Sequence, residues 1–182
     1  MGTFRALVLH EEGGKIVPRL EAVDEALLPP GEVTVRVECS TLNYKDGLIL
    51  QGLGRLVRTY PHIPGIDFAG TVEHSDAPEF KPGDPVVLTG WRVGEARWGG
   101  YAEKARVEAS FLVGRPDGLS ARHAMTIGTA GFTAMLAVSA LERHGLRPGS
   151  GEGMSRAVLK FARQASLDDQ ATRPWVAVQG RS

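Results

Sequence analysis

The sequence predicts a mainly β domain of the α+β class, in which short strands form a small barrel or sandwich and helices follow toward the C-terminus. Glycine makes up 23 and proline 11 of the 182 residues, a composition that favours many tight turns over a helical bundle. Val33, Val35 and Val37 alternate with polar residues, as in a strand with one buried face. The pattern changes at Ser120, after which helical spacing begins.

The predicted strands are short and are separated by turns. Residues 4–10 and 16–21 flank the sequence Glu12-Gly13-Gly14-Lys15, which is typical of a hairpin. The valine-alternating strand over residues 32–38 follows a Pro-Pro-Gly break. Further strands are predicted at residues 67–73, 85–88, 101–107 and 111–113.

Two helices are predicted after the strands, over residues 121–127 and 130–143. Ser120 and Thr129 are suitable N-caps for them. Gly145 lies where a left-handed residue would end the second helix. Gly128 stands at the junction, where the absence of a side chain allows the backbone to approach another surface closely.

The last part of the chain differs from the rest. Residues 148–151 have linker chemistry, so residues 1–149 are predicted to form one domain and residues 150–182 a divergent tail. In the tail, residues 156–166 carry an apolar stripe that predicts a short helix, and residues 175–178 predict a strand stub. We expect the tail helix to cover part of the apolar surface of the helices before it.

Composition excludes several classes of function. The 21 basic and 21 acidic side chains balance to a net charge of zero, which provides no field to attract nucleic acid or an anionic membrane. The single cysteine cannot form an intramolecular disulfide and fits a reducing compartment. No continuous apolar run approaches the roughly 18 residues that span a bilayer. These features predict a soluble cytoplasmic domain.

Four segments carry a more specific signal. They read STLNYKDGL from Ser40, PHIPGIDFAGTV from Pro61, TGWRVGE through WGGYAE from Thr89, and IGTAGFTAM from Ile127. In this order and spacing they resemble the catalytic half of the medium-chain dehydrogenase/reductase superfamily, and more narrowly its zinc-free quinone-oxidoreductase-like branch, which includes acryloyl-CoA reductase. The resemblance covers residues 1 to about 149 and implies a GroES-like, partly open β-barrel with flanking helices.

The residues at the zinc positions of the superfamily argue against a metal site. Zinc members have Cys where this chain has Asn43, and a His-Glu pair where it has Ile66 and Asp67. Cys39 is nearby, but no His lies at ligand spacing from it. We therefore expect no metal, and the five histidines are interpreted as structural or surface residues.

The resemblance implies NADPH as hydride donor, with an α,β-unsaturated acyl-CoA such as acryloyl-CoA, or a quinone, as substrate. Hydride addition at the β-carbon builds negative charge on the carbonyl oxygen, and a hydrogen-bond donor aimed there lowers the barrier. Tyr44 is the candidate for that catalytic donor and also for cofactor contact. Asn43 is the second catalytic candidate, and Thr129 and Thr133 are the candidate cofactor-binding hydroxyls.

Other polar residues in these segments have a structural reading. Asp46 and Asp67 are interpreted as turn carboxylates that accept backbone N–H bonds. Trp91 and Trp98 fit either a core or a substrate pocket. Arg92 and Arg97 fit either an ordinary surface or the phosphates of coenzyme A.

The resemblance ends where a Rossmann domain would begin. The Gly-x-Gly-x-Gly sequence at residues 149–153 follows no strand, and the 29 residues after it are too few for several βαβ units. We therefore expect a chain that stops before its cofactor domain and is not competent alone. The alternative is a non-catalytic GroES-like interaction module that pairs with a complete homologue, and homo-oligomerisation is compatible with either interpretation.

Overall fold

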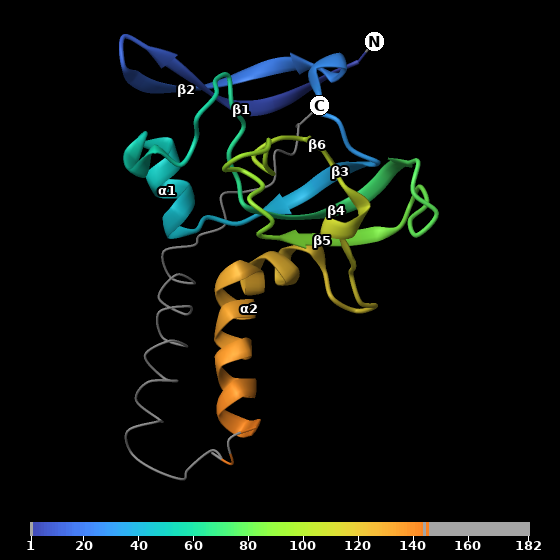
Figure 1. The fold of residues 1–182 in the computed structure, drawn as a ribbon. Coiled ribbons are helices and arrows are strands. Elements are labelled where there is room, and N and C mark those ends of the chain that lie inside the picture. The colour runs from blue at the N-terminus through green and yellow to red at the C-terminus, as the bar shows by residue number, and fades with distance from the viewer. Residues whose placement is uncertain (1, 144, 146–182) are drawn as a thin grey trace.

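The computed structural model describes residues 2–143 and residue 145, and these residues form two β layers with helices beside them (Figure 1). The strands are β1 (Thr3–Glu12), β2 (Lys15–Asp24), β3 (Val33–Ser40), β4 (Asp67–Ser75), β5 (Pro85–Thr89), β6 (Lys104–Val107) and β7 (Val113–Gly114). The helices are α1 (Tyr44–Leu50) and α2 (Ala121–Arg143), with 3-10 turns at Glu25–Leu27, Leu53–Arg55 and Ala109–Phe111. The mainly β prediction with flanking helices is confirmed.

The N-terminal hairpin forms as predicted. Strands β1 and β2 pair antiparallel through a turn in which Gly13 and Gly14 have φ of 57° and 78°, values that favour glycine. Phe4, Ala6 and Val8 bury their side chains beneath the hairpin. Backbone bonds from Leu7 N–H to the Tyr101 carbonyl and between Leu9 and His62 attach β1 to the loops of the main sheet.

The main sheet is antiparallel, with the strand order β6-β3-β4-β5-β7. Val33 and Val35 are fully buried in its core, next to Phe68 and Val86, which confirms the predicted buried face of β3. The opposite face is less exposed than the alternation suggested, because Thr34 is also buried and accepts a hydrogen bond from Arg106 Nε at 3.0 Å. Strands β6 and β4 hydrogen-bond to the two edges of β3, and the Arg106 side chain lies beside Thr34 on the second face.

Two predicted strands are shorter in the structure. The segment 101–107 is a strand only from Lys104, since Tyr101 to Glu103 bond to β1 and β3 through isolated backbone contacts. In the segment 111–113, Phe111 ends a 3-10 turn and only Val113 enters β7. Both differences place aromatic rings in loops instead of in the sheet.

Helix α1 was not predicted, because residues 43–46 have turn chemistry. Asn43 occupies the N-cap position with extended backbone, and its own N–H donates to the Asp46 carboxylate at 2.9 Å. Ile49 is buried against Leu9 and Val57. A local cap and one buried contact therefore stabilise a seven-residue helix despite Gly47 in its interior.

Helix α2 consists of the two predicted helices separated by a kink. Gly128 has φ 47° and ψ −162°, a conformation outside the helical region. The predicted Ser120 cap is confirmed, because its Oγ accepts from His123 N–H at 3.2 Å. Gly145 has φ 80° and donates to the Glu142 carbonyl, as expected at a helix end.

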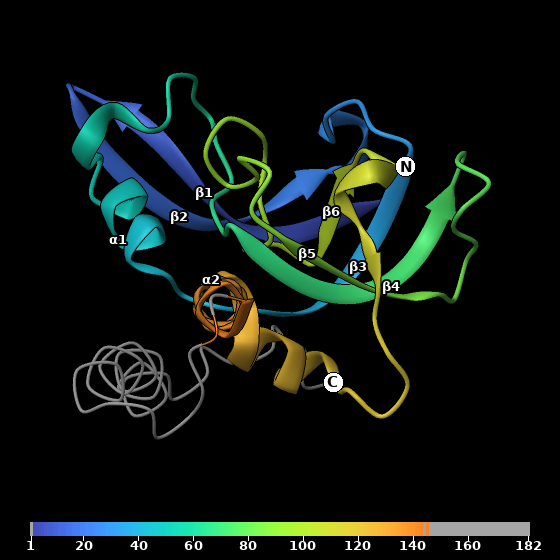
Figure 2. The ribbon, with the colours of Figure 1, turned by 60° about the horizontal axis from the view of Figure 1, so that its bottom comes forward.

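The two halves of α2 have different surroundings. Before the kink, Ala121, Ala124 and Met125 are buried against Ala69 of β4. After the kink, the helix projects away from the sheet, as both ribbon views show (Figures 1 and 2). The predicted tail helix, strand stub and domain boundary at residue 150 lie outside the described residues.

Helix α2 also corrects the expectation about membrane-spanning segments. By length and composition it is apolar enough to cross a membrane, with a mean hydropathy of 1.6 over its best window. The small residues and hydroxyls scattered through it interrupt any continuous apolar run, which is why counting runs missed it. The kink leaves 15 residues from Thr129 to Arg143 as regular helix, and this length of about 22 Å is less than the roughly 30 Å of a hydrocarbon core.

Candidate active site

The chemistry-bearing residues meet where three segments converge: the start of α1, the start of β4 and the kink of α2. Asn43, Asp46, Asp67 and Thr129 form one hydrogen-bonded cluster there, which we call the carboxylate junction. Asp46 and Asp67 have no exposed surface. Buried carboxylates are stable only when donors satisfy them, so the contacts of each define what the junction does.

Asp67 joins β4 to the other two segments. Its Oδ2 accepts from Asn43 Nδ2 at 3.0 Å and from the Thr129 N–H at 2.8 Å, and its Oδ1 accepts from the Thr129 hydroxyl at 2.5 Å. Its backbone carbonyl accepts from Ser40 Oγ at 2.6 Å. The scaffold interpretation of Asp67 fits these contacts, although its donors come from distant segments and not from its own turn.

Asp46 fixes the approach of α1 to the segment before β4. Its Oδ2 accepts from Asn43 N–H, and its Oδ1 accepts from Ile66 N–H at 3.0 Å. Burial raises the pKa of Asp46, the bonds from Asn43 and Ile66 oppose that rise, and the nearby charge of Asp67 adds to it. The interpretation of Asp46 as an acceptor of backbone amides is therefore supported.

Tyr101 closes the junction from the loop before β6. Its hydroxyl donates to the Thr41 carbonyl at 3.1 Å. Burial strongly raises the pKa of this phenol, and the charges of Asp46 and Asp67 add to the rise. Tyr101 was not selected from its sequence pattern, and its position also explains Gly65, where a Cβ would lie 2.6 Å from the Tyr101 ring.

Gly128 lets the helix kink pass directly over Asp67. A Cβ at this glycine would lie 3.0 Å from Asp67 Oδ2 and 3.1 Å from Thr41 Cγ2. The predicted close approach is thus confirmed, and its partner is the buried carboxylate. The kink places both the N–H and the hydroxyl of Thr129 within hydrogen-bonding distance of the Asp67 side chain.

The four predicted site residues have different positions. Tyr44 follows the junction directly and its side chain is 85% exposed. The side-chain amide nitrogen of Asn43 donates to Asp46 and Asp67, so its amide oxygen is the atom that could accept a bond from a ligand. The hydroxyl of Thr129 donates to Asp67 where the sequence predicted an N-cap, and the hydroxyl of Thr133 donates to the Thr129 carbonyl at 2.8 Å.

The loop between β5 and β6 lies beside this site. Trp98 packs on the core under the hairpin, whereas Trp91 is exposed and stacks on Phe111. Arg92 pairs with Glu95, and Arg97 pairs with Glu108.

Three histidine side chains within the part of the chain that the structure describes have structural partners. His62 is buried and its Nε2 is 2.9 Å from the Gly94 carbonyl oxygen, while His10 and His74 pair with Glu21 and Asp76. Cys39 is a free thiol whose pKa is raised by burial. Among residues 2–143 and 145, no group of three or more His, Cys, Asp or Glu side chains is arranged to hold a metal ion.

Comparison with known proteins agrees with this architecture. Residues 29–117 match the alcohol dehydrogenase GroES-like domain. The chain is 63% identical over 150 residues to the acrylyl-CoA reductase AcuI of Ruegeria pomeroyi, and it is 43% identical over 148 residues to the putative quinone oxidoreductase YhfP of Bacillus subtilis. Each alignment covers 81% of this chain.

Solved structures show the same likeness. The yhdH oxidoreductase from Salmonella enterica in complex with NADP superimposes with a TM-score of 0.79 at 55% identity over 81% of this chain. Escherichia coli YhdH with bound NADPH gives 0.77 at 56% identity over 80% of the chain.

The fold and the junction define a GroES-like domain of the medium-chain dehydrogenase/reductase type. Within that class, the chain is related to the acrylyl-CoA reductase and quinone oxidoreductase proteins, as the four sequence segments predicted. The chain spans about 46% of the length of the Ruegeria relative and 45% of the Salmonella structure.

Proposed function

We propose that this chain provides the substrate-side domain of an NADPH-dependent, cytoplasmic reductase that acts on an α,β-unsaturated acyl-CoA such as acryloyl-CoA. One observation carries the proposal: the exposed phenol of Tyr44 stands at the first position of α1, directly after a cap that two buried carboxylates hold in place. A donor whose backbone is held in this way, and whose hydroxyl is open to a ligand, suits an oxyanion that forms in the transition state. The relatedness to acrylyl-CoA reductases supports the substrate class.

The proposed role of Tyr44 follows from its chemistry. NADPH supplies a hydride to the β-carbon of the substrate when it is bound. The hydroxyl of Tyr44 donates a hydrogen bond to the carbonyl oxygen as negative charge develops there, and a proton completes the reduced product. Asn43 is a positioning residue in this scheme, because its side chain bonds to the carboxylates and its backbone opens α1.

The described residues fit NADPH in part. The ring of Tyr44 is free to contact a nicotinamide. Thr129 and Thr133 donate their hydroxyl hydrogens within the protein, so they offer the cofactor acceptor lone pairs and not donors. Their part in cofactor binding is therefore proposed as weak, and the larger part of the NADPH contacts is assigned to sequence that the relatives have beyond this length.

The test is a fluorescence titration with NADPH and an assay with acryloyl-CoA, both made on this chain joined to the C-terminal half of the Ruegeria relative. Tyr44→Phe is expected to lower the maximal rate by about 10-fold or more while changing affinity little, since the lost bond acts in the transition state. Tyr60→Phe, which removes the hydroxyl of a tyrosine packed against the Leu9, Ile49 and Val57 cluster, is the matched control. An unchanged rate in Tyr44→Phe would remove Tyr44 from the mechanism.

A second candidate function is supported by the distal half of α2. Phe132, Met135 and Leu136 are each more than half exposed, which is unusual for neighbouring apolar residues on one helix. A non-catalytic module that associates with a complete homologue, or with itself, would use such a face. Mixing the chain with a full-length relative and measuring mass by light scattering distinguishes the two functions. A stable complex that has no added reductase activity would support the interaction module.

A further inference from the structure

The loop after β5 holds an exposed indole in an unusual backbone conformation. Trp91 and Arg92 have φ of 53° and 59°, and they are flanked by Gly90 and Gly94 at 82° and 74°. Two consecutive non-glycine residues in the left-handed region are energetically costly, so the surrounding structure must impose them. Trp91 nevertheless remains 56% exposed, and burial of the indole therefore does not account for the conformation.

Several contacts make this loop rigid. The Arg92 carbonyl accepts from the backbone N–H groups of Glu95, Ala96 and Arg97. Val93 N–H donates to the Gly90 carbonyl, and the Gly94 carbonyl lies 2.9 Å from His62 Nε2. One face of the Trp91 indole stacks on Phe111, with ring centroids 4.9 Å apart and planes at 11°. The ring is thus fixed before any ligand arrives.

The loop borders the candidate active site. Strand β5 ends at Thr89, which pairs with Asp67, and Gly90 N–H donates to the Ile66 carbonyl at 3.2 Å. Glu95 then accepts from Lys45 Nζ at 3.1 Å and from Arg92. Lys45 follows Tyr44 in the sequence, and Arg92 follows Trp91. The Glu95 carboxylate, which both cations contact, therefore joins the segments that carry the two exposed aromatic residues.

Three cations lie on the segments next to the indole, and one of them, Arg97, has its guanidinium carbon 5.0 Å from the centroid of the Phe111 ring on which Trp91 stacks. Lys45, Arg92 and Arg97 keep 47%, 64% and 46% of their side-chain surface exposed, while the two carboxylates that pair with them are Glu95 and Glu108. Three cations against two carboxylates leave a net positive charge beside a fixed aromatic face. A planar ring that carries phosphate groups would satisfy both features, whereas a quinone would use only the first.

We propose that Trp91 is a stacking platform for the adenine ring of coenzyme A, with Lys45, Arg92 and Arg97 beside its phosphates. The proposal rests on the function proposed above and extends it, since it locates the nucleotide end of the acyl-CoA on the loop between β5 and β6. The exposed indole face receives the adenine, and the thioester end extends toward Tyr44.

Calorimetric titration of the full chain with coenzyme A tests the proposal. Trp91→Asn is the informative variant, because Asn tolerates the left-handed backbone while it removes the aromatic face. We expect the affinity for coenzyme A to fall about 5-fold to 100-fold, the range found when a stacked base loses its aromatic partner. Pantetheine, which lacks the nucleotide, should bind the variant and the original chain equally.

Further variants guard against misfolding. Trp91→Phe keeps a ring and is expected to remain within about 3-fold of the original affinity. Leu20→Asn removes another exposed apolar side chain, on β2, and should leave binding unchanged. Thermal melts of all three variants show whether the loop change affects the fold.

Two results would overturn the assignment. One is unchanged affinity for coenzyme A in Trp91→Asn, or no binding by the original chain. The other is a loss of NADPH affinity as large as that for coenzyme A, which would assign the platform to adenine nucleotides in general. Neither result depends on turnover, so failure of the platform and failure of the reductase proposal are separable.

Discussion

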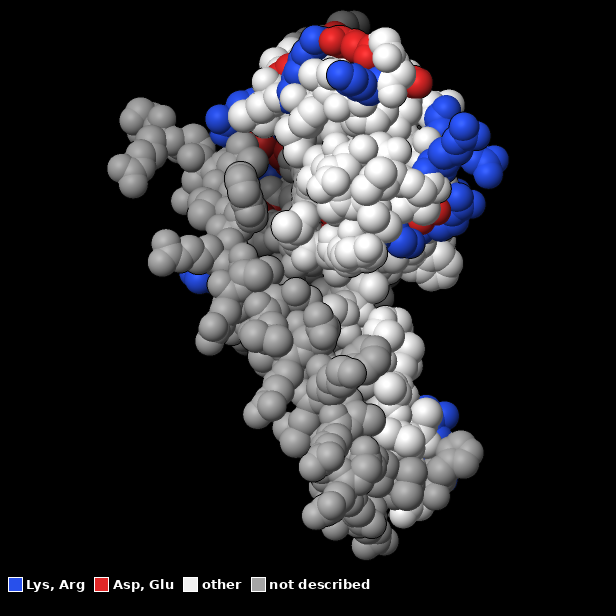
Figure 3. Space-filling model, turned by 90° about the vertical axis from the view of Figure 1, so that its left-hand side faces the viewer, with Lys and Arg blue, Asp and Glu red and all other residues white. Residues whose placement is uncertain are grey.

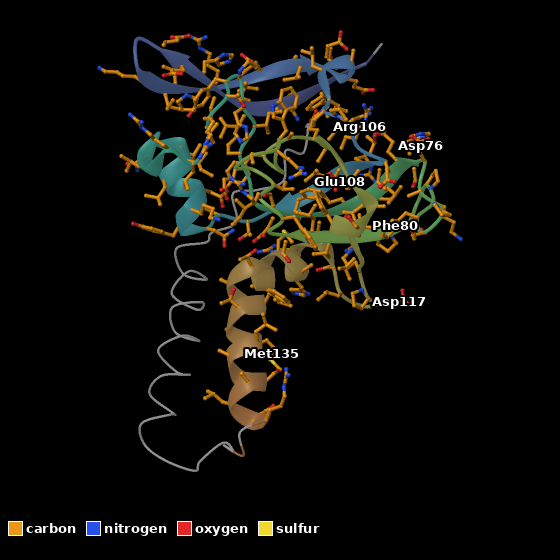
Figure 4. All side chains as sticks on the ribbon, viewed as in Figure 1. Asp76, Phe80, Arg106, Glu108, Asp117 and Met135 are labelled. Atoms are coloured by element: carbon orange, nitrogen blue, oxygen red, sulfur yellow. The ribbon has the colours of Figure 1, made fainter. Side chains whose placement is uncertain are left out.

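The carboxylate junction and the distal half of α2 meet at Thr129 and are opposite in character. At the junction, two fully buried carboxylates have their donors supplied by the protein. A few residues later, Phe132, Met135 and Leu136 expose large apolar side chains on a helix that projects from the sheet (Figure 4). In the space-filling view, the part of the projecting helix that is visible is white apart from basic atoms near its lower end (Figure 3).

This contrast separates two physical roles, orientation of the helices and association with another surface. Buried polar contacts are directional, so the junction fixes where α1 and α2 leave the sheet. Exposed apolar surface is non-directional, so the distal half of α2 favours association without specifying its geometry. The junction inside the described domain thus sets the orientation of α1 and α2. The exposed apolar face of α2 is available to contact another surface.

The largest effect is expected from Asp67→Ala. The substitution leaves Asn43 Nδ2, the Thr129 N–H and the Thr129 hydroxyl without their acceptor. Since each buried donor left unpaired costs about 1–3 kcal/mol, the free energy of unfolding should fall by about 3 kcal/mol or more. Urea denaturation measures it, with the exposed Asp76→Ala as control. A loss below about 1 kcal/mol would show that the junction contributes little to stability.

Two methionines on α2 sharpen the comparison. Met125 is buried before the kink, and Met135 is more than half exposed after it. Met125→Ala should lower the free energy of unfolding by about 2 kcal/mol, because it opens a cavity. Met135→Ala should stay within about 0.5 kcal/mol of the original chain. Equal losses at the two positions would mean that the distal half is packed in solution, and the contrast would fail.

The kink itself can be tested with a pair of glycines. Gly128→Ala places a Cβ against Asp67 in a backbone conformation that suits glycine, and we expect a loss of about 1–3 kcal/mol. Gly47→Ala in α1 is the matched control, since no atom lies within 4 Å of its Cβ position and alanine favours helix by about 1 kcal/mol. Chemical denaturation of both variants should therefore give shifts of opposite sign.

The sequence predicted the fold well because its signals are local. Alternating valines, paired glycines and a cap at Ser120 each act within a few residues, and the hairpin, β3 and the start of α2 followed from them. Helix α1 was missed because its local signal is ambiguous. The Asn and Asp residues that cap it are also typical of a turn. Its stabilising contact, between Ile49 and Leu9, spans 40 residues.

Several residues of the carboxylate junction were selected from the sequence, but the hydrogen bonds that join them were not predicted. Asn43, Tyr44 and Thr129 were selected by motif, whereas the bonds from Thr129 to Asp67 cross 62 residues and have no local signal. Tyr101 was missed because a tyrosine next to glycines in a loop is unremarkable until the fold places it beside two carboxylates. The two carboxylates and the tyrosine are visible in the sequence. How far these three side chains are buried is defined only by the tertiary structure.

The smallest expected effect concerns pH and the His62 contact that attaches the loop after β5. Burial lowers the pKa of His62 below its ordinary value of 6.5, although its bond to the Gly94 carbonyl opposes the shift. The unfolded chain therefore binds the proton more readily, so stability is full above about pH 6.5 and falls as the pH drops from there toward the folded-state pKa.

His62→Gln keeps a donor for the Gly94 carbonyl and removes the titrating group, so it should flatten the dependence of unfolding free energy on pH between about 7 and 5. Exposed His123→Gln is the control and should keep the slope of the original chain. Because His62 also contacts Leu9 of β1, a flattened slope would assign the acid sensitivity to the seam between the hairpin and the main sheet. Identical slopes in all three proteins would place it elsewhere, and the junction carboxylates would then be the next groups to substitute.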